Sequence, residues 1–166
     1  MNQPIRMIRT VLTVVMAILW SAGMAVAEGV QKIDPCTLLT KGEIQAAVGQ
    51  NVSDGALNTK ANLTAGALCE YKVGDFGAFS ILVKTTGPSE TADRTMTELN
   101  KMKIATSVVP GLGDRSFFSS PGYGMIQLNT FKGPSYLIIT VTVPGATEAA
   151  QKTQAEKLMH TALAKI

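Results

Sequence analysis

The sequence contains two cysteines, Cys36 and Cys69. Each can form an intrachain disulfide only with the other, and this possible bond constrains the fold more than any other feature. A helix signal follows Cys36 and a strand pattern surrounds Cys69, so a bond between them would fasten a helix to a sheet. In an oxidising compartment two cysteines pair by default. Closing a loop of this length stabilises a fold by roughly 3–4 kcal/mol. Two buried free thiols are the alternative. Two thiolates without a nearby histidine cannot complete a tetrahedral zinc shell, so we expect no metal site.

Residues 1–27 have the pattern of a secretory signal peptide. Arg6 and Arg9 make the start positive, residues 11–20 are apolar and uncharged, and residues 25–27 (Ala-Val-Ala) suit a signal peptidase. We predict cleavage before Glu28, a short tail at residues 28–33, and a single domain at residues 34–166 that is periplasmic or secreted. The apolar segment is short for a membrane span, which needs about 20 residues. An uncleaved anchor is the alternative, and is the one way in which we expect this chain to contact a membrane.

Removal of the signal lowers the formal net charge from +3 to +1, because Arg6 and Arg9 leave with it. A nearly neutral domain lacks the cationic surface that attracts nucleic acid or anionic lipid. We therefore expect no nucleic-acid partner. The remaining length is typical of one domain, with a core small enough for a disulfide to matter.

A short helix is predicted four residues after Cys36. Thr40 and Glu43 have the spacing of a capping box, and Leu39 and Ile44 occupy the positions of a hydrophobic staple. Gly49 suits the left-handed residue that ends many helices. The helix is too short to be stable alone in water, so it must be held by packing.

Hydrophobic periodicity predicts the remaining elements. Strands are expected at 68–73, 78–85, 125–131 and 135–143, and helices at 89–103 and from 147 to the C-terminus. A further short strand is expected after the tight turn at Gly111 and Gly113, and residues 51–66 are expected to be a loop, with a short strand near Val52 as the alternative. The strand at 135–143 is apolar on both faces, which is typical of a central strand. Short turns between consecutive strands predict an α+β fold: an antiparallel sheet of about five strands with helices packed on one face, in the order α-β-β-α-β-β-β-α.

No catalytic or cofactor motif is assembled along the chain. His160 is the only histidine, and no serine or cysteine nucleophile motif accompanies it. The Gly111-Leu112-Gly113-Asp114 segment lacks the third glycine of a dinucleotide fingerprint and the Gly-Lys-Ser/Thr of a phosphate loop, so it predicts a tight turn. We expect a protein that is not an enzyme and holds no cofactor.

Aromatic residues follow this turn. Phe117 and Tyr123 either pack in the core or line a groove. In the second case the candidate ligand groove consists of Gly111, Gly113, Asp114, Phe117 and Tyr123.

Three segments together resemble a family of small exported domains of unassigned function, known as actinobacterial envelope lipoproteins and as periplasmic proteins. These are Asp34-Pro35-Cys36-Thr37-Leu38-Leu39-Thr40, Cys69-Glu70-Tyr71 and Val109-Pro110-Gly111-Leu112-Gly113-Asp114. The resemblance extends over nearly all of the chain after the signal. It implies a disulfide between Cys36 and Cys69 and an α+β fold similar to PsbP-like domains, and it implies no catalytic residue. This chain lacks the lipidated cysteine of the lipoprotein members.

These observations predict an exported, non-catalytic module. Its expected partner is an envelope protein or a small apolar ligand, bound through one sheet face or through the groove near Phe117 and Tyr123. One alternative is an envelope hydrolase that uses Asp114, Arg115 and Glu70, which requires the three side chains to converge in one concavity. Another alternative is a structural component of the envelope that works by oligomerisation.

Overall fold

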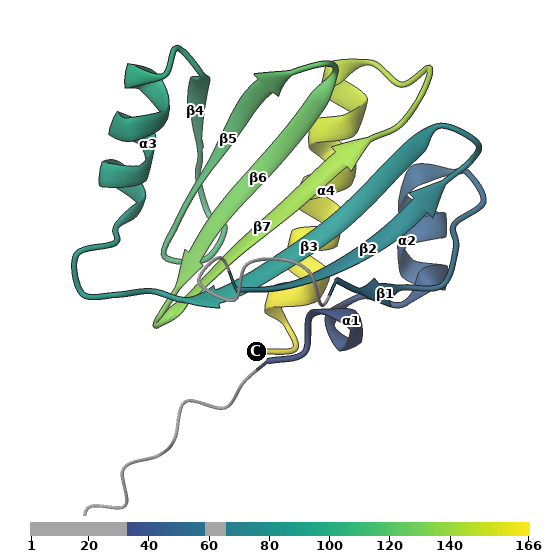
Figure 1. Cartoon of the computed structure of the whole chain (residues 1–166), viewed down its shortest axis with the longest axis horizontal. Helices are drawn as coiled ribbons and strands as arrows, with labels where there is room; N and C mark the ends of the chain where they lie inside the picture. The colour runs from purple at the N-terminus through teal and green to yellow at the C-terminus, as the bar shows by residue number, and fades with distance from the viewer. Residues whose placement is uncertain (1–32, 59–65) are drawn as a thin grey trace, which may run out of the picture. The chain divides into compact units, whose positions relative to one another are not determined.

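The computed structural model describes residues 33–58 and 66–166, which leaves the predicted signal peptide and nearly all of the predicted tail outside the described residues. Residues 33–166 form one compact unit. Its elements are α1 (Pro35–Leu38), α2 (Lys41–Val48), β1 (Ala56–Leu57), β2 (Ala67–Val73), β3 (Gly77–Thr85), α3 (Ala92–Lys101), β4 (Ala105–Val109), β5 (Arg115–Gly122), β6 (Met125–Lys132), β7 (Ser135–Thr142) and α4 (Glu148–Leu163) (Figure 1).

The seven strands of the described residues form one sheet in the order β1-β2-β3-β7-β6-β5-β4, with every neighbouring pair antiparallel. The predicted hairpins β2–β3 and β6–β7 are both present. β7 occupies the centre of the sheet, as its apolar residues on both faces predict.

The α+β class holds, but the predicted arrangement of about five strands in the order α-β-β-α-β-β-β-α is wrong. The described residues contain four helices and seven strands in the order α-α-β-β-β-α-β-β-β-β-α. The unexpected strands, β1 and β4, are the two edges of the sheet. An edge strand pairs on one side only, and both of these are largely exposed, so neither shows the alternation that marks a half-buried strand.

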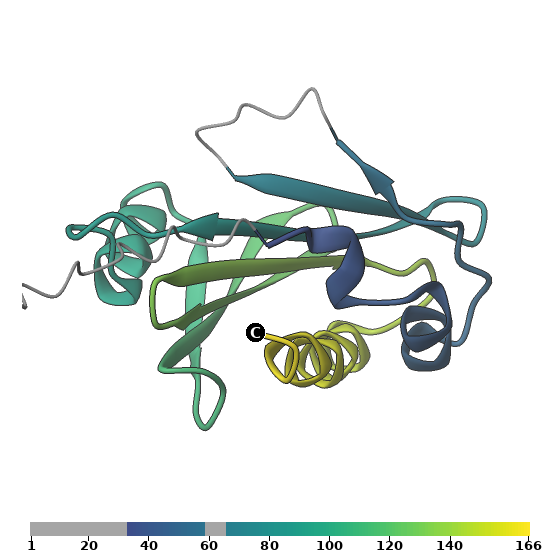
Figure 2. The same ribbon diagram turned by 90° about the horizontal axis from the view of Figure 1, so that it is seen from below.

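The expectation that all helices pack on one face is also wrong. α1, α2 and α4 cover one face and enclose the main core, whereas α3 packs on the opposite face (Figure 2). Phe117 and Phe118 mark the two sides, because successive residues of a strand point to opposite faces. Phe118 belongs to the main core, and Phe117 packs with Ala92 and Met96 of α3.

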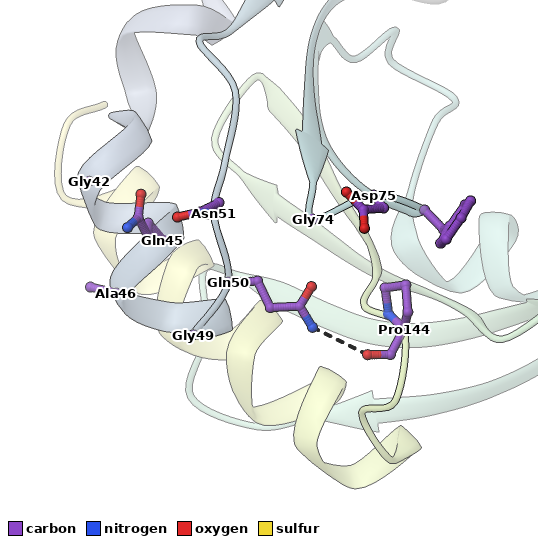
Figure 3. A pocket seen from close by; sticks show the side chains of 10 residues that line it. Gly42, Gln45, Ala46, Gly49, Gln50, Asn51, Gly74, Asp75 and Pro144 are labelled. Atoms are coloured by element: carbon purple, nitrogen blue, oxygen red, sulfur yellow. Dashed lines mark hydrogen bonds between the residues drawn. The ribbon is translucent and has the colours of Figure 1, made fainter.

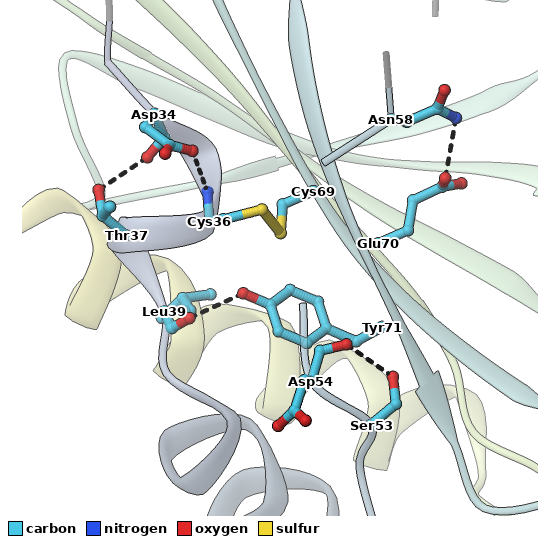
Figure 4. Close-up of a disulfide and its surroundings, with 10 residues drawn as sticks. All are labelled: Asp34, Cys36, Thr37, Leu39, Ser53, Asp54, Asn58, Cys69, Glu70 and Tyr71. Atoms are coloured by element: carbon cyan, nitrogen blue, oxygen red, sulfur yellow. Dashed lines mark hydrogen bonds between the residues drawn. A yellow bond between two sulfur atoms is a disulfide. The ribbon is translucent and has the colours of Figure 1, made fainter. Parts of the chain in front are cut away.

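A disulfide and a buried hydrogen bond fasten the N-terminal segment to the sheet. Cys36 and Cys69 are bonded, with their Cα atoms 5.1 Å apart (Figure 4). Two residues along β2, the Tyr71 hydroxyl donates to the carbonyl of Leu39 at 2.8 Å, just before α2 begins. Burial raises the pKa of Tyr71, so the phenol stays protonated and remains a donor at neutral pH. The predicted pairing of Cys36 with Cys69 is confirmed.

The predicted capping signals of α2 are confirmed as well. The Thr40 hydroxyl accepts from the Glu43 N–H, the Glu43 carboxylate accepts from the Thr40 N–H at 2.7 Å, and Gly49 ends the helix with φ 71°. Lys165 Nζ lies 3.1 Å from the Glu43 carboxylate and ties the residues after α4 to the start of α2. The segment before Thr40 is a separate turn of helix, α1, whose N-cap Asp34 accepts from the Cys36 N–H at 2.9 Å.

We predict that replacing both cysteines (Cys36→Ala with Cys69→Ala) lowers the free energy of unfolding by about 3–4 kcal/mol, because the loop between them is then no longer closed in the unfolded chain. Urea unfolding of the purified protein, with and without dithiothreitol, measures the effect. Reduction should destabilise the wild-type protein and leave the double variant unchanged. An equal response of the two proteins to the reductant would contradict this prediction.

A second prediction concerns pH. The Thr40 N–H, with help from Lys165, lowers the pKa of Glu43 in the folded protein. A carboxylate whose pKa is lower in the folded state stabilises above its unfolded pKa of about 4.3, and this stabilisation is lost as the pH falls through the folded value. Glu43→Gln should therefore be less stable than wild type by up to about 1 kcal/mol at pH 7.

The difference between Glu43→Gln and wild type should shrink as the pH falls below about 4.3 and vanish once the pH lies well below the folded pKa, because Glu43 is then protonated in both folded and unfolded wild type. Urea unfolding over a series of pH values from 7 downward tests this expectation. Glu156→Gln, in the middle of α4, is the matched control, because it lies away from any helix N-terminus. If the difference in free energy of unfolding stayed the same as the pH falls, the charge of Glu43 would not be its cause.

Candidate functional site

The five residues of the candidate ligand groove predicted from the sequence do not lie together in the structure. Gly111, Gly113 and Asp114 lie in the β4–β5 turn, whereas Tyr123 lies in the β5–β6 turn at the other end of β5. A strand of eight residues separates the two turns by about 25 Å. Phe117 is fully buried beneath α3, while Tyr123 is 100% exposed. Phe117 is therefore a core residue, and the five residues do not line one groove.

Asp114, Arg115 and Glu70 do not converge either. The Asp114 carboxylate accepts from the Gly133 N–H at 2.7 Å, and Arg115 pairs with Asp93 at the start of α3 at 3.2 Å. Glu70 lies on β2, four strand positions from β5, which is about 19 Å across the sheet. Asp114 therefore contacts the β6–β7 turn, and Arg115 contacts the start of α3. The three side chains do not form the concavity that a hydrolase would need.

A different place on the described surface is hollowed. An open hollow of about 1000 Å³ lies where the end of α2, the β2–β3 turn and the loop after β7 meet (Figure 3). It is lined by Gly42, Gln45, Ala46, Gly49, Gln50, Asn51, Gly74, Asp75, Phe76 and Pro144. The lining therefore comes from three segments that are far apart in the sequence.

Hydrogen bonds hold two of these segments against the third. The Gln50 side-chain amide donates to the carbonyl of Pro144 at 3.2 Å (Figure 3). The Gly74 N–H donates to the carbonyl of Asn51 at 2.8 Å. Just before these residues, Val52 forms an isolated antiparallel bridge with Val73 at the end of β2. Hydrogen bonds of the protein itself thus hold the three walls of the hollow together.

Two glycines allow the walls to approach this closely. Gly74 has φ +54°, and a Cβ there would lie 2.6 Å from Oε1 of Gln50. A Cβ on Gly77 would lie 2.7 Å from Cδ of Pro144, so the β2–β3 hairpin touches the loop after β7. A side chain at Gly77 would meet backbone carbonyls as well as Pro144 and would push the walls of the hollow apart, whereas a side chain at Gly74 would displace the Gln50 amide.

The hollow offers polar groups and one aromatic ring. Gln45, Gln50 and Asn51 supply carboxamides, Asp75 supplies a carboxylate, and the side chain of Phe76 is 89% exposed. The described residues that line it include no serine, cysteine, histidine, lysine or arginine. This set can make hydrogen bonds and apolar contacts with a ligand, and it presents no nucleophile with an adjacent base.

A second polar cluster lies on the sheet face that α3 shares. Tyr136 Oη donates to Asn129 Oδ1 at 2.6 Å, and Asn129 Nδ2 donates to Ser119 Oγ at 3.0 Å. Ser119 Oγ in turn lies 3.3 Å from Gln127 Oε1, and Gln127 Nε2 lies 3.5 Å from Thr140 Oγ1. Burial raises the pKa of Tyr136, which keeps the phenol protonated as the first donor. The groups of this cluster satisfy one another, so it stabilises the sheet and leaves little to bind a ligand.

Sequence reasoning located the parts of the hollow without locating the hollow. Gly49 was predicted as a helix end, and a short turn was predicted between the strands at 68–73 and 78–85; both predictions match the structure. No sequence signal places the turn beside the end of α2, because that proximity depends on the path of the chain through the sheet. His160, the only histidine, is exposed on α4, outside the hollow.

No helix within residues 33–58 and 66–166 is long and apolar enough to cross a membrane. Comparisons of the chain with protein-family models, with curated proteins and with solved structures found no match.

Proposed function

We propose that this protein is an exported, non-catalytic module that binds a small ligand in the hollow between α2, the β2–β3 turn and Pro144. The observation that supports this most directly is the hydrogen-bonded construction of the hollow. A site that is already formed loses less conformational entropy when it binds, and most small-molecule sites are largely formed in advance. A volume of about 1000 Å³ is at the upper end of the range typical for such sites.

The lining favours a polar ligand over the small apolar ligand expected from the sequence. An apolar molecule would remove the carboxamides of Gln45, Gln50 and Asn51 and the carboxylate of Asp75 from water without giving them new partners. Unpaired burial of such groups costs roughly 1–3 kcal/mol each in proteins. A ligand with its own donors and acceptors avoids that cost.

Export is supported by the disulfide and by the sequence of the first 27 residues. Disulfides persist in oxidising compartments, and the bond between Cys36 and Cys69 fits such a location. The residues that resemble exported envelope domains are consistent with a periplasmic or secreted protein. We propose that the mature chain begins at Glu28 and is released from the membrane.

The test uses protein expressed with its own signal and purified from the periplasm or medium, with its N-terminus read by mass spectrometry. We expect a mixed library of polar and apolar fragments, screened by ¹H–¹⁵N NMR, to shift the amide signals of Gln50, Asn51, Gly74 and Asp75. The reason is that these residues line the hollow on two of its walls. The side-chain amide signals of Gln45 and Asn51 should move with them.

Gly74→Ala should weaken these shifts, because its Cβ would displace the Gln50 amide that lines the hollow, while Gly124→Ala should keep them. Both glycines have positive φ, but a Cβ at position 124 meets no atom within 4 Å, so backbone strain is similar and only the hollow differs. If no fragment shifted the hollow signals of the folded wild-type protein, or if all shifts fell elsewhere, the proposed function would be wrong.

A further inference from the structure

We infer that the hollow binds a neutral sugar or another uncharged polyhydroxylated molecule. This inference rests on the proposed function and names the class of ligand. It follows from three properties of the lining: its charge, the hydrogen bonds that its side chains leave open, and its one exposed ring.

The charge of the lining disfavours anions. Asp75 is the one charged residue among the described residues that line the hollow, and no cationic side chain accompanies it. Lys41 is adjacent to Gly42 in the sequence, but its ammonium pairs with Asp54 at 3.3 Å. A phosphate or carboxylate ligand would therefore meet a like charge and no cationic partner, and would depend on the carboxamide N–H groups alone. A cation gains little, because one exposed carboxylate contributes at most about 1 kcal/mol to an ion pair in water.

The open hydrogen-bonding groups match hydroxyls. A hydroxyl donates and accepts at once, and so does a carboxamide. No hydrogen bond within the described residues occupies the side-chain amides of Gln45 or Asn51, whereas the Gln50 amide nitrogen is committed to Pro144. The lining thus offers two free amide groups and the carboxylate of Asp75. Adjacent hydroxyls on a sugar ring can satisfy such groups in pairs.

The exposed ring of Phe76 suits the apolar face of a sugar. An aromatic ring is negative on its face, so it attracts the slightly positive C–H groups of a pyranose ring. Phe76 is 89% exposed and lines the hollow beside Asp75. A polar ligand of this class therefore uses both kinds of lining group, which neither a purely apolar nor a purely ionic ligand does.

The experiment titrates the exported protein with eight compounds followed by ¹H–¹⁵N NMR. Glucose, N-acetylglucosamine, maltose and cellobiose are the neutral sugars; glucuronate is the anion, glucosamine the cation, and indole and hexanol the apolar compounds. We expect at least one neutral sugar to shift the signals of Gln50, Asn51, Gly74 and Asp75 at lower concentration than any of the other four compounds.

Three variants probe the groups that carry the inference. Phe76→Ala, Gln45→Ala and Asp75→Asn should each weaken the sugar by about five- to tenfold, the loss expected for one hydrogen bond or one ring contact. These side chains are exposed, so their replacement should leave unfolding by urea nearly unchanged. Tyr123→Ala is the matched control for Phe76→Ala, because Tyr123 is an equally exposed aromatic residue that does not line the hollow.

The outcomes separate this inference from the proposed function. Preferred binding of glucuronate, glucosamine or an apolar compound at the hollow signals would overturn the sugar assignment and leave the binding function in place. Equal weakening by Tyr123→Ala and Phe76→Ala would overturn it too, because the ring contact would then not be specific to the hollow. If none of the eight compounds shifts the hollow signals while the fragment library does, the ligand belongs to another class. If both fail, the binding function itself is wrong.

Discussion

The fastening of the N-terminal segment to β2 is the constraint on which the rest of the molecule depends. Cys69 and Tyr71 point to the same face of that strand, one bonded to Cys36 and the other donating to Leu39. α2 is only eight residues long and would not be stable alone. These two attachments fix the residues immediately before it, so α2 begins at a defined place against the sheet. One wall of the hollow is the end of this helix, and its position therefore derives from a disulfide and a buried phenol.

Local signals in the sequence were sufficient wherever one short segment determines its own structure. The capping box of Thr40 and Glu43, the left-handed Gly49 and the two tight hairpins are examples, since each depends on residues within a few positions. The pairing of Cys36 with Cys69 was within reach for a different reason, because the chain contains no other cysteine. The central place of β7 followed from its apolar residues on both faces, which only a strand covered on both sides can bury.

The rest depended on how distant segments meet. The edge strands β1 and β4 have solvent on one side, so their residues carry no clear pattern. Phe117 is buried and Tyr123 is exposed, because Phe117 packs beneath α3 and Tyr123 lies in a turn. No sequence pattern showed that α3 packs on the second face of the sheet. The hollow is the extreme case. Gln50, Asp75 and Pro144 are ordinary loop residues when each is taken alone, and they line one hollow only because the sheet order places their loops together.

The two polar clusters of the fold explain why we propose the hollow, and not the buried cluster, as the binding site. The chain from Tyr136 to Asn129 and Ser119 is buried and closed, with each donor directed at an acceptor of the protein itself. Opening it to a ligand would require breaking bonds that already stabilise the sheet. At the hollow the reverse holds: the backbone is bonded and fixed, while the side-chain amides of Gln45 and Asn51 are presented to water. Fixed walls with unoccupied donors and acceptors favour recognition, because a ligand exchanges only water for its contacts.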